Sequence, residues 1–246
     1  MFYQYNNVEE NFIRQLFLQG RTQLGRVFVD ETVLPRNSSL HVLDYQRASH
    51  IIRSASHIGI GVCYCRHKMT HVGRACQAPQ NICMTFHIVA AALIRNGFAQ
   101  RVEKFEALDL LRQARSHHLV QFGENVREQV NFICNCCGCC CEAMIVTRNF
   151  AFLPPVHPSP FMAQADVGCG KCVRRCPVAA ISIPPAKSRH GTAVVDRQRC
   201  LGCGVCITAC PTANLTLVER PERVLAPLNT AHRSVLMAIE RARCRS

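Results

Sequence analysis

The stretch that decides the fold reads Cys200-Leu-Gly-Cys203-Gly-Val-Cys206-Ile-Thr-Ala-Cys210-Pro211, with the spacing C-x2-C-x2-C-x3-C-P. The same spacing recurs upstream in Asp166-Val-Gly-Cys169-Gly-Lys-Cys172-Val-Arg-Arg-Cys176-Pro177, where aspartate replaces the first cysteine. Two residues between successive cysteines let the chain turn tightly enough for neighbouring thiolates to reach one compact core. The intervening glycines permit the positive φ angles of such turns. The duplicated run therefore predicts a small unit built around two thiolate-bound centres.

Both runs resemble the cysteine motif of bacterial-type ferredoxins with two 4Fe–4S clusters. The resemblance implies a crossed arrangement, because in those proteins the fourth cysteine of each run binds the other cluster. One cluster is then expected to be held by Cys200, Cys203, Cys206 and Cys176, and the other by Cys169, Cys172, Cys210 and Asp166. Structural zinc is the alternative, but zinc sites favour separated C-x2-C pairs over a triple run that closes in Cys-Pro.

Asp166 has two interpretations. As a ligand, its carboxylate would make one iron labile, allow the 3Fe–4S and 4Fe–4S forms to interconvert, and leave a position open to outside ligands. Alternatively, the site holds only three cysteines, or a cysteine from elsewhere in the chain completes it. We expect carboxylate ligation or a labile iron, so that the two clusters behave differently.

Ten more cysteines form two dense groups upstream, and such densities do not arise from core packing. Residues 58–63 and 130–134 have the pattern of short strands, each ending at a cysteine group. Two such strands side by side would bring both groups together as a metal site. The expected ligands there are Cys63, Cys65, Cys76, Cys83, Cys134, Cys136, Cys137, Cys139, Cys140 and His71.

Three kinds of site compete for these residues. One or more additional iron–sulfur clusters is the favoured interpretation. Structural zinc is the second, with Cys65, His71, Cys76 and Cys83 as its ligands. A redox-active thiol site is the third, since adjacent cysteines such as Cys136-Cys137 form strained disulfides.

The region from about residue 28 to 215 resembles iron–sulfur proteins of anaerobic bacteria, in which a cysteine-rich domain precedes a dicluster ferredoxin module. The resemblance implies a fold and a cofactor class but no substrate. The residues that carry it are Cys63-Tyr-Cys65-Arg66, His71, Cys76, Cys83 and Cys134-Asn-Cys136-Cys137-Gly138-Cys139-Cys140. The Cys136-Cys137-Gly138 string is also similar to the CCG domains of heterodisulfide reductases. The downstream C-x2-C of those domains would be Cys169 and Cys172, which the dicluster motif already uses.

The expected fold class is α+β: an α/β cysteine-rich domain followed by a ferredoxin-like dicluster module. Apolar periodicity predicts helices over 44–57, 84–96, 103–117 and 228–243. The expected division is a helical arm at 1–27, the cysteine-rich domain at 28–147, a Pro-rich linker at 148–161, the dicluster module at 162–219, and a C-terminal helix with a basic tail at 220–246.

Composition indicates the cellular compartment in which the protein works. The chain has 246 residues and 18 cysteines, a density typical of disulfide-bonded domains only in short secreted chains. The N-terminus lacks the basic and apolar segments of a signal peptide, and no apolar stretch reaches the ~18 residues of a membrane span. A reducing cytoplasm in an anaerobic or microaerobic host is therefore expected.

The formal net charge of +13 is unlike that of simple ferredoxins, which are commonly acidic. A basic carrier is steered toward a redox partner with an acidic docking surface. Nucleic acid is the rival explanation, but the charge is spread thinly and no binding motif is present, so no nucleic-acid binding is expected.

Together these features predict an electron-transfer protein that relays electrons through two 4Fe–4S clusters to or from a partner oxidoreductase. One alternative is a small iron–sulfur reductase with its chemistry at the N-terminal cysteines. Another is a cluster-scaffold or sensor protein.

Overall fold

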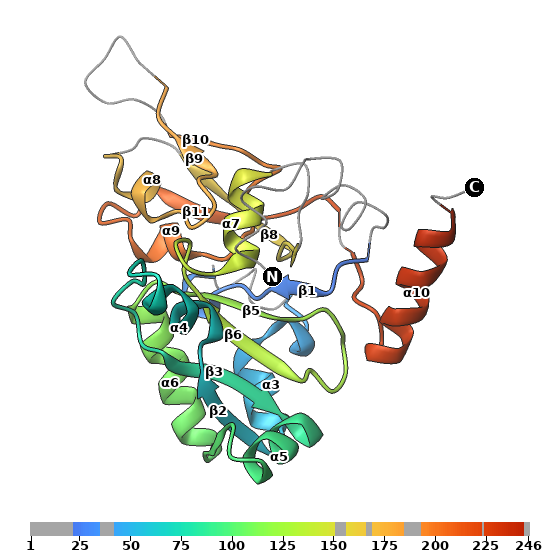
Figure 1. Cartoon of the computed structure of the whole chain (residues 1–246). Helices are drawn as coiled ribbons and strands as arrows, with labels where there is room; N and C mark the ends of the chain where they lie inside the picture. Colours follow the sequence, from blue (N-terminus) through green and yellow to red (C-terminus); the bar gives the residue numbers. More distant parts are fainter. Residues whose placement is uncertain are drawn as a thin grey trace.

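The computed structural model describes residues 22–34, 42–150, 156–165, 169–184, 193–222 and 224–243. Its largest element is a seven-stranded sheet in which all neighbours are antiparallel except β1 and β7 (Figure 1). In spatial order its strands are β4 (Gln100–Arg101), β2 (Ile58–Val62), β3 (Asn81–Phe86), β6 (Phe132–Cys136), β5 (Val120–Glu124), β1 (Gly25–Val27) and β7 (Val156–His157). Strand β3 thus separates β2 and β6, the two strands expected to lie side by side.

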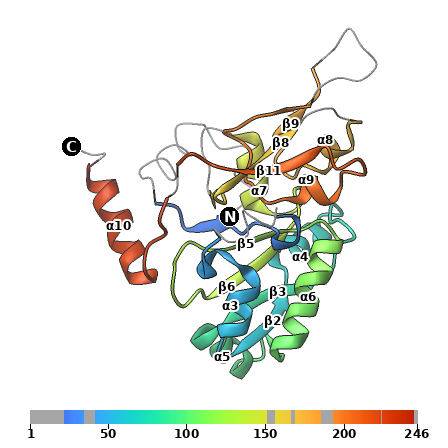
Figure 2. The same ribbon diagram turned by 180° about the vertical axis from the view of Figure 1, so that it is seen from behind.

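One face of this sheet packs against α3 (Ala48–Ser54) and α6 (Lys104–Ser116), which Figure 2 shows over the sheet. Strand β3 contributes Met84 and Phe86 to this core, each at most 1 % exposed. Since side chains alternate along a strand, Cys83 points to the opposite face. The sheet therefore has a helix-covered apolar face and a second face that carries cysteine.

Two predicted helices differ from the observed ones. The helix expected over 84–96 begins only at His87, as α5 (His87–Arg95), because residues 84–86 complete β3 with alternating burial. The helix expected over 44–57 is divided into a 3-10 turn, η3 (Asp44–Gln46), and α3. The helix expected over 103–117 corresponds to α6.

In its described residues, the C-terminal module contains two small antiparallel sheets and two short helices. Strand β8 (Phe161–Ala165) pairs with β11 (Leu215–Glu219), and β9 (Ile181–Ser182) pairs with β10 (Val194–Val195). The helices are α8 (Lys171–Arg175) and α9 (Val205–Thr208). With the larger sheet and its helices, this arrangement confirms the α+β class.

The module packs directly on the cysteine-bearing side of the N-terminal region. One buried apolar cluster contains side chains of the large sheet, of α7 (Glu142–Asn149) and of the module. The backbone amide of Asp30, before the 3-10 turn η2 (Glu31–Val33), donates to the carbonyl of Cys203 at 3.0 Å. The cysteines of both regions therefore share one interior.

The C-terminal helix α10 (Thr230–Arg243) returns to the N-terminal region. Arg233 forms an ion pair with buried Glu124 at 2.8 Å, and the Thr230 hydroxyl donates to the same carboxylate at 2.9 Å. The range predicted as a linker contains the end of α7 and strand β7. Most of the predicted helical arm, and Cys244 in the tail, lie outside the described residues. Within the described part of the chain, no helix is both long and apolar enough to cross a membrane.

Candidate metal centres

The two short helices of the module begin in the same way. Each follows a glycine in the left-handed region, Gly170 at φ 81° and Gly204 at φ 87°, a conformation that glycine adopts without steric cost. Cys172 and Cys206 then lie in the first turn of α8 and α9, with both side chains buried. The duplicated sequence thus produces duplicated thiolate-presenting turns.

Four cysteines line one cavity in the module. Cys176, Cys200, Cys203 and Cys206 surround it together with apolar side chains such as those of Ala163, Val178 and Leu217. The backbone amide of Ala163 donates to Cys200 Sγ at 3.4 Å, and that of Ala180 donates to Cys176 Sγ at 3.2 Å. Amide donors of this kind stabilise negative charge on sulfur.

Burial in this cavity disfavours a free thiolate. It raises the pKa of Cys203 to about 12, and it also raises the pKa of Cys206. A thiol in such surroundings keeps its proton unless a metal replaces it, since a bound cation deprotonates a coordinating thiol. The donor set and its surroundings therefore suit a thiolate-bound metal cluster.

The remaining described cysteines of the module form the second group. Burial raises the pKa of Cys172, to which the nearby Cys210 and Cys169 add a smaller electrostatic contribution. The Cys210 thiol lies 3.6 Å from the Thr212 hydroxyl. Asp166, predicted as the fourth ligand, lies outside the described residues.

This geometry defines an iron–sulfur protein: two cysteine groups, each assembled from both runs, in a small α+β module. Residues 167–214 match the family of the 4Fe-4S dicluster domain, so the C-terminal region carries the domain that the cysteine spacing predicts. No curated protein matches the chain, and no solved structure matches it. The cysteine-rich N-terminal region lies outside the family match.

Four N-terminal cysteines form a compact set, here called the four-thiol group: Cys76, Cys137, Cys139 and Cys140. All four sulfur atoms lie within 4.8 Å of one another. The Sγ atoms of Cys76 and Cys137 are 3.6 Å apart, and those of Cys139 and Cys140 are 3.7 Å apart. Four thiolates on one tetrahedral ion, at a metal–sulfur distance of about 2.3 Å, stand roughly 3.8 Å apart. The group therefore has the dimensions of a mononuclear tetrahedral site.

The other six N-terminal cysteines form a closed circle, here called the thiol ring. Each thiol lies within hydrogen-bonding reach of two neighbours in the circle. The order around it is Cys63, Cys65, Cys141, Cys136, Cys134 and Cys83. Its sulfur atoms are less tightly gathered than those of the four-thiol group.

Strand geometry delivers three of the ring cysteines. Cys134 and Cys136 are two residues apart on β6, so both side chains point to one face of the sheet. Met84 of β3 is paired with Ile133 of β6, and both belong to the helix-covered core. Cys83, one residue before Met84, therefore points to the same face as Cys134.

The other three ring cysteines come from the ends of elements. Cys63 follows β2 and is the N-cap residue of α4 (Tyr64–His71), while Cys65 lies in the first turn of that helix. Cys141 is the N-cap residue of α7. The ammonium group of Lys68 on α4 forms an ion pair with the carboxylate of Glu142 on α7, and this pair links the two helices.

Neighbouring thiols shift one another's pKa values around the ring. Hydrogen bonds from neighbouring thiols, first from Cys65 and then from Cys83, lower the pKa of Cys63 to about 2. Those from Cys136 and then Cys83 lower the pKa of Cys134 to about 5. The pKa of Cys141 is also lowered, whereas those of the three thiols that donate, Cys65, Cys83 and Cys136, are raised. Contacts between neighbouring thiols therefore favour loss of a proton within the ring, and the thiolate is the form that binds metals.

Arg66 lies between the ring and the four-thiol group, and it is 1 % exposed. Its Nη1 donates to the carbonyl of Asn135 at 3.0 Å and contacts Cys137 Sγ at 3.8 Å. Burial acts to lower its pKa, but the charges of Cys63, Cys137 and Cys83 raise it overall. Thiolates thus supply the anionic environment of this buried guanidinium.

The structure divides the predicted N-terminal ligands between these two groups. Cys65 and Cys83 belong to the ring and Cys76 to the four-thiol group, so the set expected for zinc is not brought together. His71 is exposed, with its Nε2 3.2 Å from that of His67, and it belongs to neither group.

Two residues of this region were not among the predicted ligands. Cys141 closes the ring, and the signal for it was its place in the run of three consecutive cysteines 139–141. Arg66 stood out only within the resemblance, and no spacing rule indicates that its guanidinium is buried.

Proposed function

We propose that this protein transfers single electrons through two 4Fe–4S clusters to or from a partner oxidoreductase. One cluster is held by Cys176, Cys200, Cys203 and Cys206, and the other by Cys169, Cys172 and Cys210, with Asp166 as fourth ligand. The observation that carries the proposal is the closeness of the two groups. The charge of Cys172, in the second group, contributes to the raised pKa of Cys206 in the first, and α8 contacts α9. Clusters at such positions exchange electrons readily.

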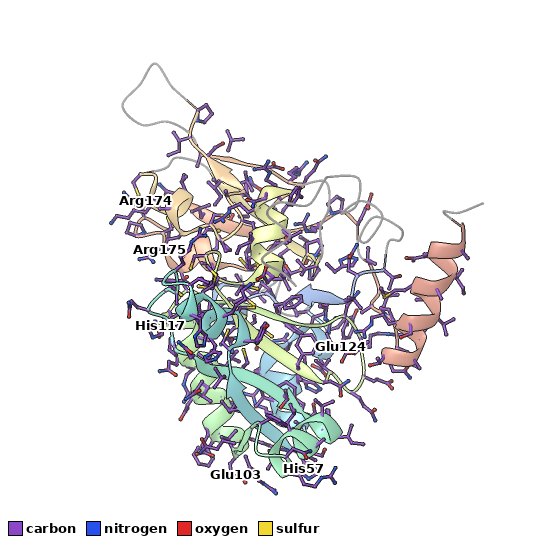
Figure 3. All side chains as sticks on the ribbon, viewed as in Figure 1. His57, Glu103, His117, Glu124, Arg174 and Arg175 are labelled. Carbon is purple, nitrogen blue, oxygen red and sulfur yellow. The ribbon has the colours of Figure 1, made fainter. Side chains whose placement is uncertain are left out.

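The partner is a protein with an acidic surface. A hollow at the rim of the module is lined by His118, Lys171, Arg174, Arg175, Thr208 and Ala209. Figure 3 shows Arg174 and Arg175 beside each other, on the same side of the molecule as His117. This basic rim lies on α8, the helix that carries Cys172, so a partner docked there approaches the second cluster. Opposite charge speeds such encounters.

We place the protein in a reducing, cytoplasmic and anaerobic setting. Every described cysteine is a free thiol, including pairs in contact with each other. Contacting thiols in an oxidising compartment form disulfides and lose their capacity to bind metal.

The test is electron paramagnetic resonance of anaerobically purified protein during a redox titration. The reduced protein should show the interaction spectrum of two spin-coupled 4Fe–4S clusters, and Cys203→Ser should replace this spectrum with the simpler signal of the remaining cluster of the module. Cys244→Ser serves as the control, because this cysteine is outside both predicted ligand sets. Reduced protein without a 4Fe–4S signal, or a Cys203→Ser variant with an unchanged spectrum, would contradict the proposal.

A further inference from the structure

We propose that the thiol ring is a third redox centre, which holds a 4Fe–4S cluster, and that the adjacent four-thiol group holds a single Zn²⁺ ion. The ring consists of Cys63, Cys65, Cys83, Cys134, Cys136 and Cys141. This goes beyond the two-cluster relay, because neither site contains a residue of the dicluster domain.

The distances between sulfur atoms distinguish a site for a single metal ion from a site for a 4Fe–4S cluster. The four-thiol group has the ~3.8 Å sulfur–sulfur spacing of ligands on one tetrahedral ion. A cubane instead binds each thiolate to a different iron, so its thiolates stand further apart. The ring is the wider arrangement: its members contact only their neighbours around a closed circle. It also offers six sulfurs, so four can bind a cluster and two remain as thiols.

The buried positive charge of Arg66 favours an anionic cluster in the thiol ring. An unpaired buried charge is costly in a protein interior, yet no described residue accepts a hydrogen bond from Nε or Nη2 of Arg66. The groups that face this guanidinium are the carbonyl of Asn135 and the thiols Cys63, Cys83 and Cys137. A cluster with four thiolates carries about two negative charges when oxidised, which would balance the cation of Arg66.

The packing provides a route for electrons into the ring. Cys134, Cys136, Cys141 and Cys65 belong to the same apolar cluster as Cys172, Cys200 and Cys206 of the module. The loop of the four-thiol group also lies against the module. A Cβ on Gly138 would lie 2.5 Å from the carbonyl oxygen of Pro177, the residue after Cys176.

In each transfer, the cluster bound by Cys176 is oxidised by one electron and the ring cluster is reduced by one. No bond forms or breaks, and no further reactant is needed.

The first experiment measures iron, acid-labile sulfide and zinc in anaerobically purified full-length protein. We expect about twelve irons from three 4Fe–4S clusters, a matching amount of sulfide, and about one zinc. About eight irons with spectra of two clusters would overturn the third centre and leave the two-cluster relay intact. If the wild-type protein instead contains iron that depends on the ring cysteines but shows no signal from the two clusters of the module, the result would contradict the two-cluster relay and leave the ring cluster standing.

Matched variants locate each metal. A Cys63→Ser/Cys134→Ser/Cys141→Ser variant keeps only three of the six ring sulfurs, so it should lose about a third of the iron and sulfide and keep its zinc. The Cys76→Ser/Cys139→Ser variant should lose zinc and keep all iron. The opposite pattern, or unchanged iron in the ring variant, would overturn the assignment. If a variant fails to fold, the wild-type count still decides whether a third cluster is present, since about eight irons would overturn it.

Discussion

At the scale of single residues, Arg66 is a buried cation beside the thiol ring, and its charge acts on Cys63. Its guanidinium is fixed by the Asn135 carbonyl and shielded from water. A positive charge close to a cluster stabilises the reduced form, which carries one more negative charge. In a partly shielded interior, this interaction amounts to about 1–2 kcal/mol.

We therefore predict that Arg66→Gln lowers the midpoint potential of the ring cluster by roughly 40–90 mV, the same energy for a one-electron couple. Arg66→Lys keeps the charge and should shift the potential much less. Redox titration followed by paramagnetic resonance measures both values. The control is Arg112→Gln, which alters an exposed cation paired with Asp109 on α6. Equal potentials for wild type and Arg66→Gln would show that the guanidinium is only structural.

The sequence alone predicts a cysteine grouping where the cysteines are close together along the chain, and it does not where the grouping joins distant segments. The seven described module cysteines lie in two local runs, so the dicluster motif that their spacing matches predicted that Cys176 would lie with Cys200, Cys203 and Cys206, as it does around one cavity. The N-terminal cysteines depend on pairing between distant segments: Cys76 lies between Cys65 and Cys83 in sequence, yet it joins Cys137, Cys139 and Cys140. Which thiols meet there is decided by the sheet, and no local spacing rule contains that information.

At the scale of elements, the two cluster-binding turns can be compared directly. Gly170 and Gly204 occupy equivalent positions and have nearly equal positive φ angles. Their surroundings differ. A Cβ on Gly170 would lie 3.5 Å from Ile183, whereas one on Gly204 would lie 2.8 Å from Val33 Cγ2 and 3.2 Å from the Asp30 Cβ. The Gly204 turn is therefore packed against the segment of η2 in the N-terminal region, whereas among the described residues a Cβ on Gly170 would meet only Ile183.

We predict that Gly170→Ala costs about 1–2 kcal/mol of stability, from backbone strain alone. Gly204→Ala should cost about 1 kcal/mol more, because the segment carrying η2 must move. Thermal unfolding of the two variants under anaerobic conditions measures the difference. Equal destabilisation would show that the contact with Val33 carries no energy.

Strand β3 shows why one element was predicted wrongly. Its last residues, Met84 to Phe86, are followed directly by α5, so the apolar pattern runs from strand into helix without a break. A period of two over so few residues resembles part of a helical period. Because the prediction lacked β3, it placed β2 beside β6. In the structure, β3 lies between these two strands and supplies Cys83 to the ring.

At the scale of the whole molecule, the chain has a net charge of +13, and Lys171, Arg174 and Arg175 place part of the positive charge at the rim around α8. We predict that Arg174→Glu/Arg175→Glu slows electron exchange with an acidic ferredoxin at least about tenfold at low ionic strength, and that the difference shrinks as salt is added. Stopped-flow absorbance measures the rate. Arg101→Glu, an exposed change on the edge strand β4, should have a much smaller effect. Equal slowing by the two variants would indicate that only overall charge matters.

The ligands of the two N-terminal sites are interleaved along the chain. In the second cysteine group, Cys136 and Cys141 belong to the ring while Cys137, Cys139 and Cys140 between them belong to the four-thiol group. The six residues 136–141 therefore carry ligands of both sites. A single serine substitution there changes one ligand of one site and leaves the loop in place. An insertion or deletion within 136–141 would instead shift the ligands of both sites at once.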